Sequence, residues 1–153
     1  MNRTISIPEW HMLAKEGTAP PVRIQLNGVS MYPLIRMNQD YVTVAPIREA
    51  PATGDVVLFL NKDTGRYVVH RIWKVKDGKV LIWGDNCTEP DGWYQMNVVL
   101  GKIVQIERGK RIIHPDPKTG LRWAKFWHKF RPGFYFVWRI KDGITRRIKR
   151  LKE

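Results

Sequence analysis

The chain has 153 residues and a formal net charge of +13, and 43% of its residues are hydrophobic. This length and apolar content exclude a disordered polypeptide and are typical of one domain with its own core. A single cysteine, Cys87, excludes an internal disulfide, and no stretch approaches the roughly 18 apolar residues of a membrane span. Because no apolar leader follows the N-terminus, we expect a cytoplasmic protein.

The positive charge is concentrated in the last third of the sequence. Through residue 106 there are 12 Lys and Arg against 10 Asp and Glu, whereas from residue 107 onward there are 15 against 4. A contact with an anionic partner is therefore expected in the last third.

The first predicted element is a short helix after Ser6. Ser6 and Glu9 have the S-x-x-E spacing of a capping box, Pro8 is tolerated in a first helical turn, and Gly17 marks the end. We expect residues 1–21 to form this helix and an extended lead-in.

Strand signals dominate the next ninety residues. Runs of β-branched and aromatic residues predict strands at residues 22–28, 41–46, 55–61, 66–75, 79–84 and 97–107. Asp77 and Gly78, between two of these runs, are typical of a two-residue hairpin turn. The sequence predicts a mainly β fold over residues 22–113, with a coiled antiparallel or mixed sheet, and argues against a Rossmann-type domain.

Helical periodicity returns in residues 114–153, which we interpret as a basic, aromatic helical tail. Trp123, Trp127 and Phe130 recur at i, i+4 and i+7, with basic residues on the other faces. Three interpretations stay open: a helix that packs these rings on the β-domain, an anionic membrane surface contacted by residues 121–153, and, less favoured, nucleic acid.

One serine, one histidine and two aspartates are the candidate catalytic residues. Ser30 follows a glycine turn, His70 is the polar break in an apolar run, and Asp85 and Asp91 share a turn-rich segment. A serine hydroxyl becomes nucleophilic when a base takes its proton, and a carboxylate can orient an imidazole base. Each residue alone is more often a turn or surface residue, and only their combination indicates a catalytic site.

Taken together, the segments resemble the type I signal peptidases and the related self-cleaving SOS-type repressors, a superfamily of β-rich serine peptidases. The nucleophile box is similar to GVSMYPLIRMNQDYVTV, and the Gly-Asp strand with the base box is similar to TGDVVLFLNKDTGRYVVHRIWKV. The Gly-Asp-Asn box is similar to WGDNCTEPD, and the closing strand to NVVLGKIVQI. The four segments occur in the family's order within residues 22–106.

The resemblance implies Ser30 as the nucleophile and His70 as the general base. A histidine at this position is typical of the archaeal and endoplasmic-reticulum branch, where bacterial enzymes carry a lysine. That branch also has an aspartate after the Gly-Asp-Asn box, which Asp91 matches. Asp85 remains the alternative third member or a structural residue of the turn.

The turn around the serine is expected to bind substrate. Gly28 stands where bacterial signal peptidases have an oxyanion-binding serine, so backbone N–H groups, that of Ser30 and a neighbour's, are expected to hold the oxyanion. The positions expected to bind the oxyanion or the substrate are Gly28, Val29, Met31 and Pro33. The family binds its substrate as an added strand.

The sequence departs from the signal peptidases in showing no membrane span. We therefore expect a serine endopeptidase that cleaves a peptide or preprotein in the cytoplasm or on the inner face of the membrane, without a cofactor. A histidine base near its ordinary pKa of about 6.5 predicts activity that rises between about pH 6 and 7. The alternative is a catalytically silent β-domain, a binding module whose basic tail contacts nucleic acid, a membrane or a protein.

Other potentially reactive side chains receive structural roles. The remaining histidines, His11, His114 and His128, lack the spacing of metal ligands, so no metal site is expected. Cys87 is interpreted as a packing residue because no second motif supports it as a nucleophile.

Overall fold

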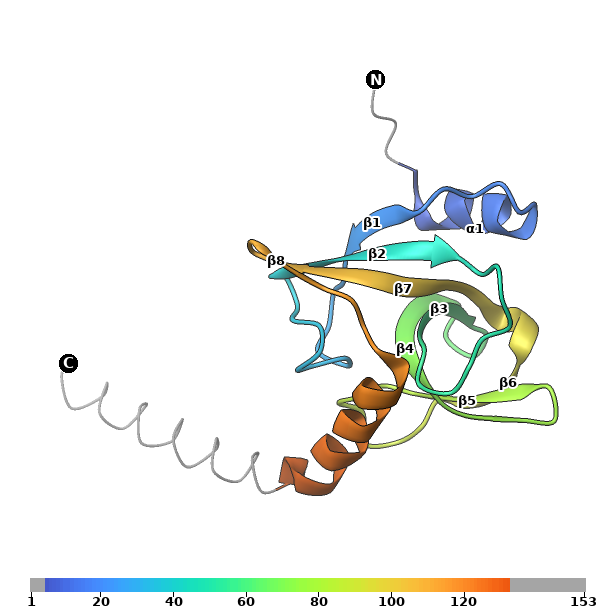
Figure 1. Ribbon diagram of the computed structural model, residues 1–153. Coiled ribbons are helices and arrows are strands. Elements are labelled where there is room, and N and C mark those ends of the chain that lie inside the picture. The colour runs from blue at the N-terminus through green and yellow to red at the C-terminus, as the bar shows by residue number, and fades with distance from the viewer. Residues whose placement is uncertain (1–4, 133–153) are drawn as a thin grey trace, which may run out of the picture.

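The computed structural model describes residues 5–132, which are built around one curled antiparallel sheet in the form of a half-barrel (Figure 1). The strands are β1 (Val22–Gln25), β2 (Asp40–Pro46), β3 (Val56–Asn61), β4 (Arg66–Lys76), β5 (Lys79–Trp83), β6 (Gly92–Gln95), β7 (Val99–Arg108) and β8 (Arg111–Ile113). They lie in the order β1-β2-β7-β3-β4-β5-β6, and β8 pairs with β7. The expected mainly β fold is confirmed.

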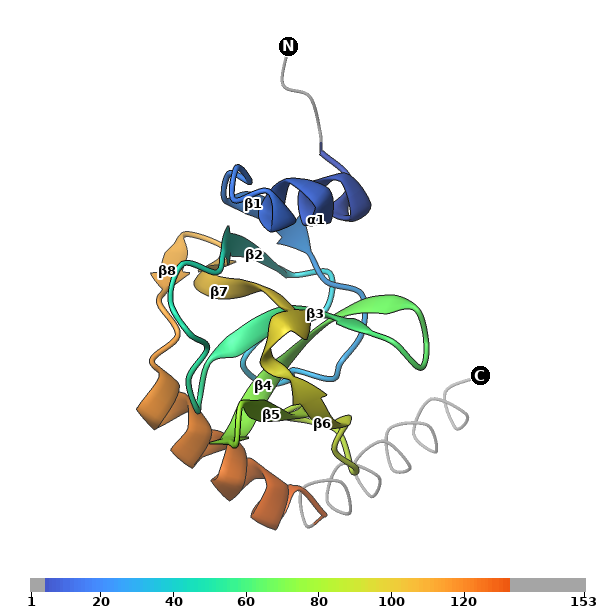
Figure 2. The ribbon, with the colours of Figure 1, turned by 90° about the vertical axis from the view of Figure 1, so that its right-hand side faces the viewer.

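The N-terminal helix, α1 (Ile7–Lys15), begins where the capping pattern predicts. The Ser6 hydroxyl accepts from the Glu9 N–H, and the Glu9 carboxylate accepts from the Ser6 N–H. Trp10 is fully buried and packs where Gly101 of β7 has no side chain to obstruct its ring. The helix therefore covers one end of the sheet and contributes to its core (Figure 2).

Strand β3 is buried on both faces. Val56 and Leu58 join the hydrophobic cluster that contains Trp10, while Val57 and Phe59 join a second cluster with β4 and β5. Since successive side chains of a strand point to opposite faces, burial on both sides explains the continuous apolar run of this strand. The ladder places His70 of β4 opposite Val57, on the side of the second cluster.

The hairpin between β4 and β5 has the predicted turn. Asp77 and Gly78 have φ values of 51° and 69°, the left-handed conformation that a two-residue turn of type I′ requires at both positions. The strand predicted over residues 22–28 ends at Gln25, and the residues beyond it form the loop that carries Ser30. The short strands β6 and β8 were not predicted.

A helix over residues 117–132 follows β8 and packs against the body of the protein; it is the orange helix in Figure 1. Its inward positions include Ala124, which is fully buried, and the half-buried Trp127. Its outward face carries exposed Trp123, Phe126 and Phe130. The interpretation that Trp123 and Phe130 pack on the β-domain together with Trp127 is therefore wrong. The rest of the predicted helical tail, residues 133–153, lies outside the described residues.

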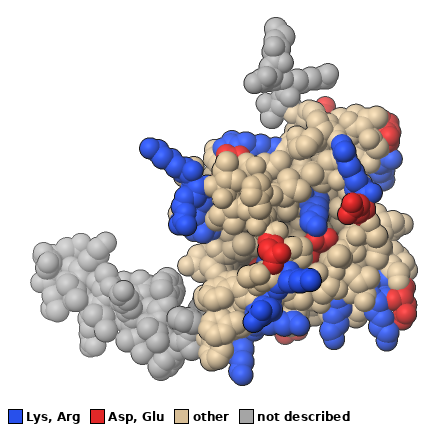
Figure 3. All heavy atoms as spheres, viewed as in Figure 1, with Lys and Arg blue, Asp and Glu red and all other residues tan. Residues whose placement is uncertain are grey.

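On the face shown in Figure 3, Lys and Arg side chains are interspersed with Asp and Glu.

Candidate active site

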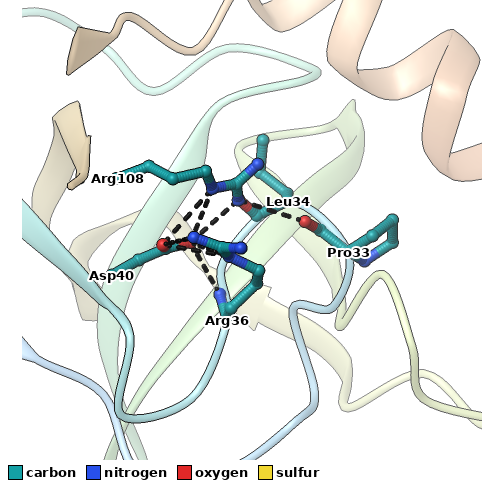
Figure 4. A network of polar contacts seen from close by, with 5 residues as sticks. All are labelled: Pro33, Leu34, Arg36, Asp40 and Arg108. Carbon is teal, nitrogen blue, oxygen red and sulfur yellow. Dashed lines mark hydrogen bonds and ion pairs between the residues drawn. The ribbon is translucent and has the colours of Figure 1, made fainter. Parts of the chain in front are cut away.

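The loop over residues 26–39 carries Ser30, and a buried carboxylate anchors its end. Asp40 is fully buried and forms ion pairs with Arg36 at 2.9 Å and Arg108 at 2.8 Å (Figure 4). Burial raises the pKa of the Asp40 carboxyl, but hydrogen bonds from Arg108 and Arg36 outweigh it and lower the pKa to about 2. Arg108 also donates to the carbonyl of Leu34 at 2.9 Å. This network ties the serine loop to the start of β2 and the end of β7.

The loop residues around Ser30 point in different directions. Met31 is 3% exposed and packs in the core, whereas Val29 is 54% exposed. Gly28 has a φ of 118° and nothing within 4 Å of the place a Cβ would take, so its backbone is open to an approaching chain. Pro33 is half-buried, and its carbonyl accepts from an arginine of β7 at 3.4 Å. Met31 thus anchors the loop, and Gly28 and Val29 present its open backbone.

Two backbone donors beside the serine have no acceptor. Within residues 5–132, the N–H groups of Ser30 and Met31 donate to no other residue. Adjacent free N–H groups at a nucleophile are the arrangement that can stabilise an oxyanion.

His70 is held against Asp91. Its Nδ1 lies 2.6 Å from Asp91 Oδ2, and the imidazole is buried, with the residue 6% exposed. The Asp91 N–H donates to the carbonyl of Ile82 at 2.9 Å, which fixes the aspartate beside the sheet. Burial lowers the pKa of His70, but the hydrogen bond to Asp91 and the contact with Cys87 raise it to about 9. Near neutral pH the imidazole is therefore largely cationic.

Asp85 has a different partner. Its carboxylate accepts two hydrogen bonds from Arg71, from Nε at 2.8 Å and Nη2 at 2.7 Å, and both side chains are at most 2% exposed. Arg71 also donates to the carbonyl of Gly54 at 2.8 Å. Of the two candidate aspartates, the structure therefore brings Asp91 to His70 and pairs Asp85 with Arg71.

Asn86 connects the serine loop to the histidine. Its N–H donates to the carbonyl of Ser30 at 2.7 Å, and its side-chain amide donates to the carbonyl of Val29 at 3.1 Å. The next residue, Cys87, has its thiol 4.0 Å from His70 Nε2. Within the described residues the Ser30 hydroxyl makes no hydrogen bond, to His70 or to any other group. The structure thus joins the two segments through their backbone, with a thiol facing the imidazole.

Sequence reasoning missed the contribution of the helix over residues 117–132. The indole N–H of Trp127 donates to Asn86 Oδ1 at 3.2 Å, and His128 Nε2 lies 3.3 Å from the carbonyl of Gly84. The ring of Trp127 also lies edge-on to Tyr32 of the serine loop, with centroids 6.0 Å apart. The helical spacing of the tail was visible in the sequence, but nothing in it indicated a contact with residues 84–87.

Within residues 5–132, no three His, Cys, Asp or Glu side chains are grouped so that they could hold a metal ion. No helix in this part of the chain combines the length and apolar character needed to cross a membrane. No protein-family model and no curated protein sequence matches the chain. The function of the protein is therefore inferred from the residues of the site.

Proposed function

We propose that the protein is a serine endopeptidase in which Ser30 is the nucleophile, His70 the general base and Asp91 the residue that orients the base. The observation that carries this proposal is the 2.6 Å contact between the buried His70 and Asp91, together with the link from His70 through Cys87 and Asn86 to the loop that presents Ser30. A carboxylate on Nδ1 leaves Nε2 as the proton acceptor, as a serine nucleophile requires.

The chemistry follows from these positions. Neutral His70 takes the proton of the Ser30 hydroxyl, Oγ attacks the peptide carbonyl, and the N–H groups of Ser30 and Met31 hold the oxyanion. The imidazolium then protonates the leaving amine, and water hydrolyses the acyl-enzyme with His70 again as base. Catalytic hydrogen bonds are often long before substrate binds, and in this mechanism the Ser30 hydroxyl displaces the Cys87 thiol at Nε2.

The substrate of this proposal is a peptide or preprotein segment in extended conformation. Asn27, Gly28 and Val29 are exposed, and the space above Gly28 is empty, so an added strand has room to pass beside the serine. Binding of this kind gives affinity through main-chain hydrogen bonds and leaves the side chains of the substrate to determine specificity.

A fluorophosphonate probe reacts with nucleophilic serines and so tests the role of Ser30 directly. The chain contains two serines, Ser6 and Ser30. We expect covalent labelling that peptide mapping assigns to Ser30. Ser30→Ala and His70→Ala should abolish both labelling and cleavage of a peptide library. Ser30→Ala should change thermal melting little, whereas His70→Ala also loses the ion pair with Asp91 and should melt at a lower temperature. His114→Ala, which changes an exposed histidine, is the matched control. Cleavage by Ser30→Ala at the parent's rate would exclude this mechanism.

The second candidate is a binding module that retains the fold without catalysis. Two observations favour it: the Ser30 hydroxyl makes no hydrogen bond with His70, and the raised pKa of His70 leaves little neutral base near pH 7. In that case the probe should label neither serine at any pH up to about 10, although the protein is folded.

We also propose that the protein acts inside the cell at an anionic membrane surface. The helix over residues 117–132 exposes Trp123, Phe126 and Phe130, and its cationic residues Lys125 and Lys129 are exposed beside them. Aromatic rings flanked by cations are typical of helices that lie in a lipid interface. The charge of the last third of the sequence adds attraction to anionic headgroups.

A further inference from the structure

The thiol of Cys87 lies in the candidate site but is not a reacting group in the proposed peptidase mechanism. His70 Nε2 lies 4.0 Å from Cys87 Sγ, while Nδ1 of the same ring lies 2.6 Å from Asp91. Cys87, His70 and Asp91 thus place a thiol, an imidazole and a carboxylate in a row, so that a second nucleophile lies against the same base. In the described structure the thiol, and not the Ser30 hydroxyl, faces Nε2.

The backbone builds this contact. The Cys87 N–H donates to the carbonyl of Gly84 at 3.0 Å, and the Cys87 carbonyl accepts from the indole of Trp83 at 3.1 Å. A Cβ at position 84 would lie 2.6 Å from the Cys87 sulfur and 2.9 Å from His70 Nε2. Glycine at 84 is therefore required for the thiol and the imidazole to approach each other.

The thiol lies beside a cationic side chain. The imidazolium of His70 faces it, and the nearby carboxylates already have cationic partners, Asp91 with His70 and Asp85 with Arg71. A cysteine within reach of a histidine is an arrangement that activates a thiol as a nucleophile. Cys87 is half-buried, so a small reagent can reach it.

We propose that Cys87 is a reactive nucleophile held against His70, and a site of covalent modification by small disulfides and alkylating electrophiles. With a disulfide, the Cys87 sulfur forms a new S–S bond, the S–S bond of the reagent breaks, and one half leaves as a thiolate. With iodoacetamide, an S–C bond forms and iodide leaves. Neither reaction needs a further oxidant or reductant.

Modification of Cys87 should also close the serine centre, that is, block the approach of the Ser30 hydroxyl to His70. An adduct on the sulfur occupies the space in front of His70 Nε2, which the Ser30 hydroxyl must enter to lose its proton. This consequence rests on the proposed peptidase function, whereas the reactivity of the thiol does not.

The test uses the full chain, whose single cysteine makes every thiol label a measurement of Cys87. Iodoacetamide incorporation at pH 7 is followed by mass spectrometry, with N-acetylcysteine amide as the reference. Because His70 lies against the sulfur, we expect the parent to react at least about tenfold faster than the reference. His70→Gln and Gly84→Ala should lose most of this advantage, while Cys87→Ser takes up no label.

The control is His114→Ala, and circular dichroism shows which variants are folded. If His70→Gln unfolds, Asp91→Asn takes its place, since it keeps the imidazole but removes the carboxylate that favours the cation. A parent protein that reacts no faster than the reference, or a folded His70→Gln that reacts as fast as the parent, would overturn the proposal.

Fluorophosphonate labelling of Ser30 before and after alkylation separates the two proposals. Loss of Ser30 labelling after alkylation, with labelling retained in Cys87→Ser, supports closure of the centre. Fast alkylation without any serine labelling contradicts the peptidase function alone. Serine labelling that continues after complete alkylation contradicts the closure.

Discussion

The two acid–base pairs of the site differ in what their charges can do. Arg71 and Asp85 form a fully buried bidentate pair, and a guanidinium does not lose its proton at accessible pH. This pair is a fixed structural element that joins β4 to residues 84–87. His70 and Asp91 form a pair of similar length in which the cation titrates. The proposed chemistry therefore belongs to the second pair.

The raised pKa of His70 predicts how stability depends on pH. A folded pKa of about 9, against 6.5 for the unfolded chain, stabilises the folded protein fully below about pH 6.5 and not at all above about pH 9. The difference corresponds to as much as about 3 kcal/mol. We expect Asp91→Asn to lower the free energy of unfolding by up to this amount at pH 6 and by much less at pH 9.5. Urea unfolding of the parent and of Asp91→Asn at pH 6 and at pH 9.5 measures this difference in the free energy of unfolding.

The raised pKa of His70 also changes the pH range in which hydrolysis is expected to rise. Because the general base must be neutral, hydrolysis should rise between about pH 8 and 10, rather than between pH 6 and 7. In Asp91→Asn any residual activity should rise at lower pH. An Asp91→Asn protein with the same loss of stability at pH 6 and pH 9.5 would show that this pair does not titrate as described.

Among the secondary-structure elements, the helix over residues 117–132 contacts the Gly-Asp-Asn segment of the site. It contacts Asn86 through Trp127 and Gly84 through His128, and Asn86 in turn holds the carbonyl groups of Val29 and Ser30. The helix, the Gly-Asp-Asn segment and the serine loop are thus linked by consecutive hydrogen bonds.

Trp127→Ala is expected to loosen this linkage. The loss of a half-buried indole and its hydrogen bond should cost about 2 kcal/mol and lower the melting temperature by roughly 5 °C. The Asn86 amide, which donates to Ser30, should exchange with solvent faster, and labelling of Ser30 should slow. Trp123→Ala is the matched control, because Trp123 lies on the same helix but is 47% exposed. Equal amide exchange at Asn86 in the two variants would exclude the linkage.

The helices and strands also show which signals in the sequence were sufficient to predict secondary structure. The strands containing Val56 and His70 were predictable because their apolar runs are long, and the capping pattern at Ser6 is a local signal. The strand β6 has four residues and depends on pairing with β5, which no local pattern reveals. Periodicity identified the helix of Trp123 and Trp127, but not which face is buried, since that depends on what it packs against.

The same distinction holds for the site. The resemblance of the serine, histidine and Gly-Asp-Asn segments named Ser30, His70 and Asp91 as candidates, but their spacing could not decide between Asp85 and Asp91. That choice depends on the three-dimensional position of Arg71, which uses the Asp85 carboxylate. The raised pKa of His70 likewise results from two neighbours distant in sequence, Asp91 and Cys87, whose effect outweighs the lowering by burial.

At the scale of the whole molecule, charge and exposed aromatic surface lie on the same part of the chain. The positive charge is concentrated from residue 107 onward, and three exposed aromatic rings follow one another along the helix over residues 117–132. Phe126 lies between its neighbours, with ring centroids 5.3 Å from Trp123 and 4.5 Å from Phe130. The rings therefore form one continuous apolar surface.

This surface predicts binding to anionic lipid. Vesicles of phosphatidylcholine with about one third phosphatidylglycerol should sediment the protein, and neutral vesicles should not, because a basic side chain near an anionic surface contributes about 1 kcal/mol. Replacing Trp123, Phe126 and Phe130 by alanine should weaken binding at least about tenfold at constant charge. Trp93→Ala, which removes an equally exposed indole from β6, should bind like the parent.

The salt dependence of binding distinguishes the predicted binding to lipid from the alternative, binding to nucleic acid. Lipid binding that depends on both charge and rings should weaken in high salt, yet the aromatic variant should bind more weakly at every salt concentration. Binding to DNA would instead fall linearly with the logarithm of salt concentration, with a slope set by the number of phosphates contacted. Retention on DNA with such a slope, and no sedimentation with anionic vesicles, would identify nucleic acid as the partner of this surface.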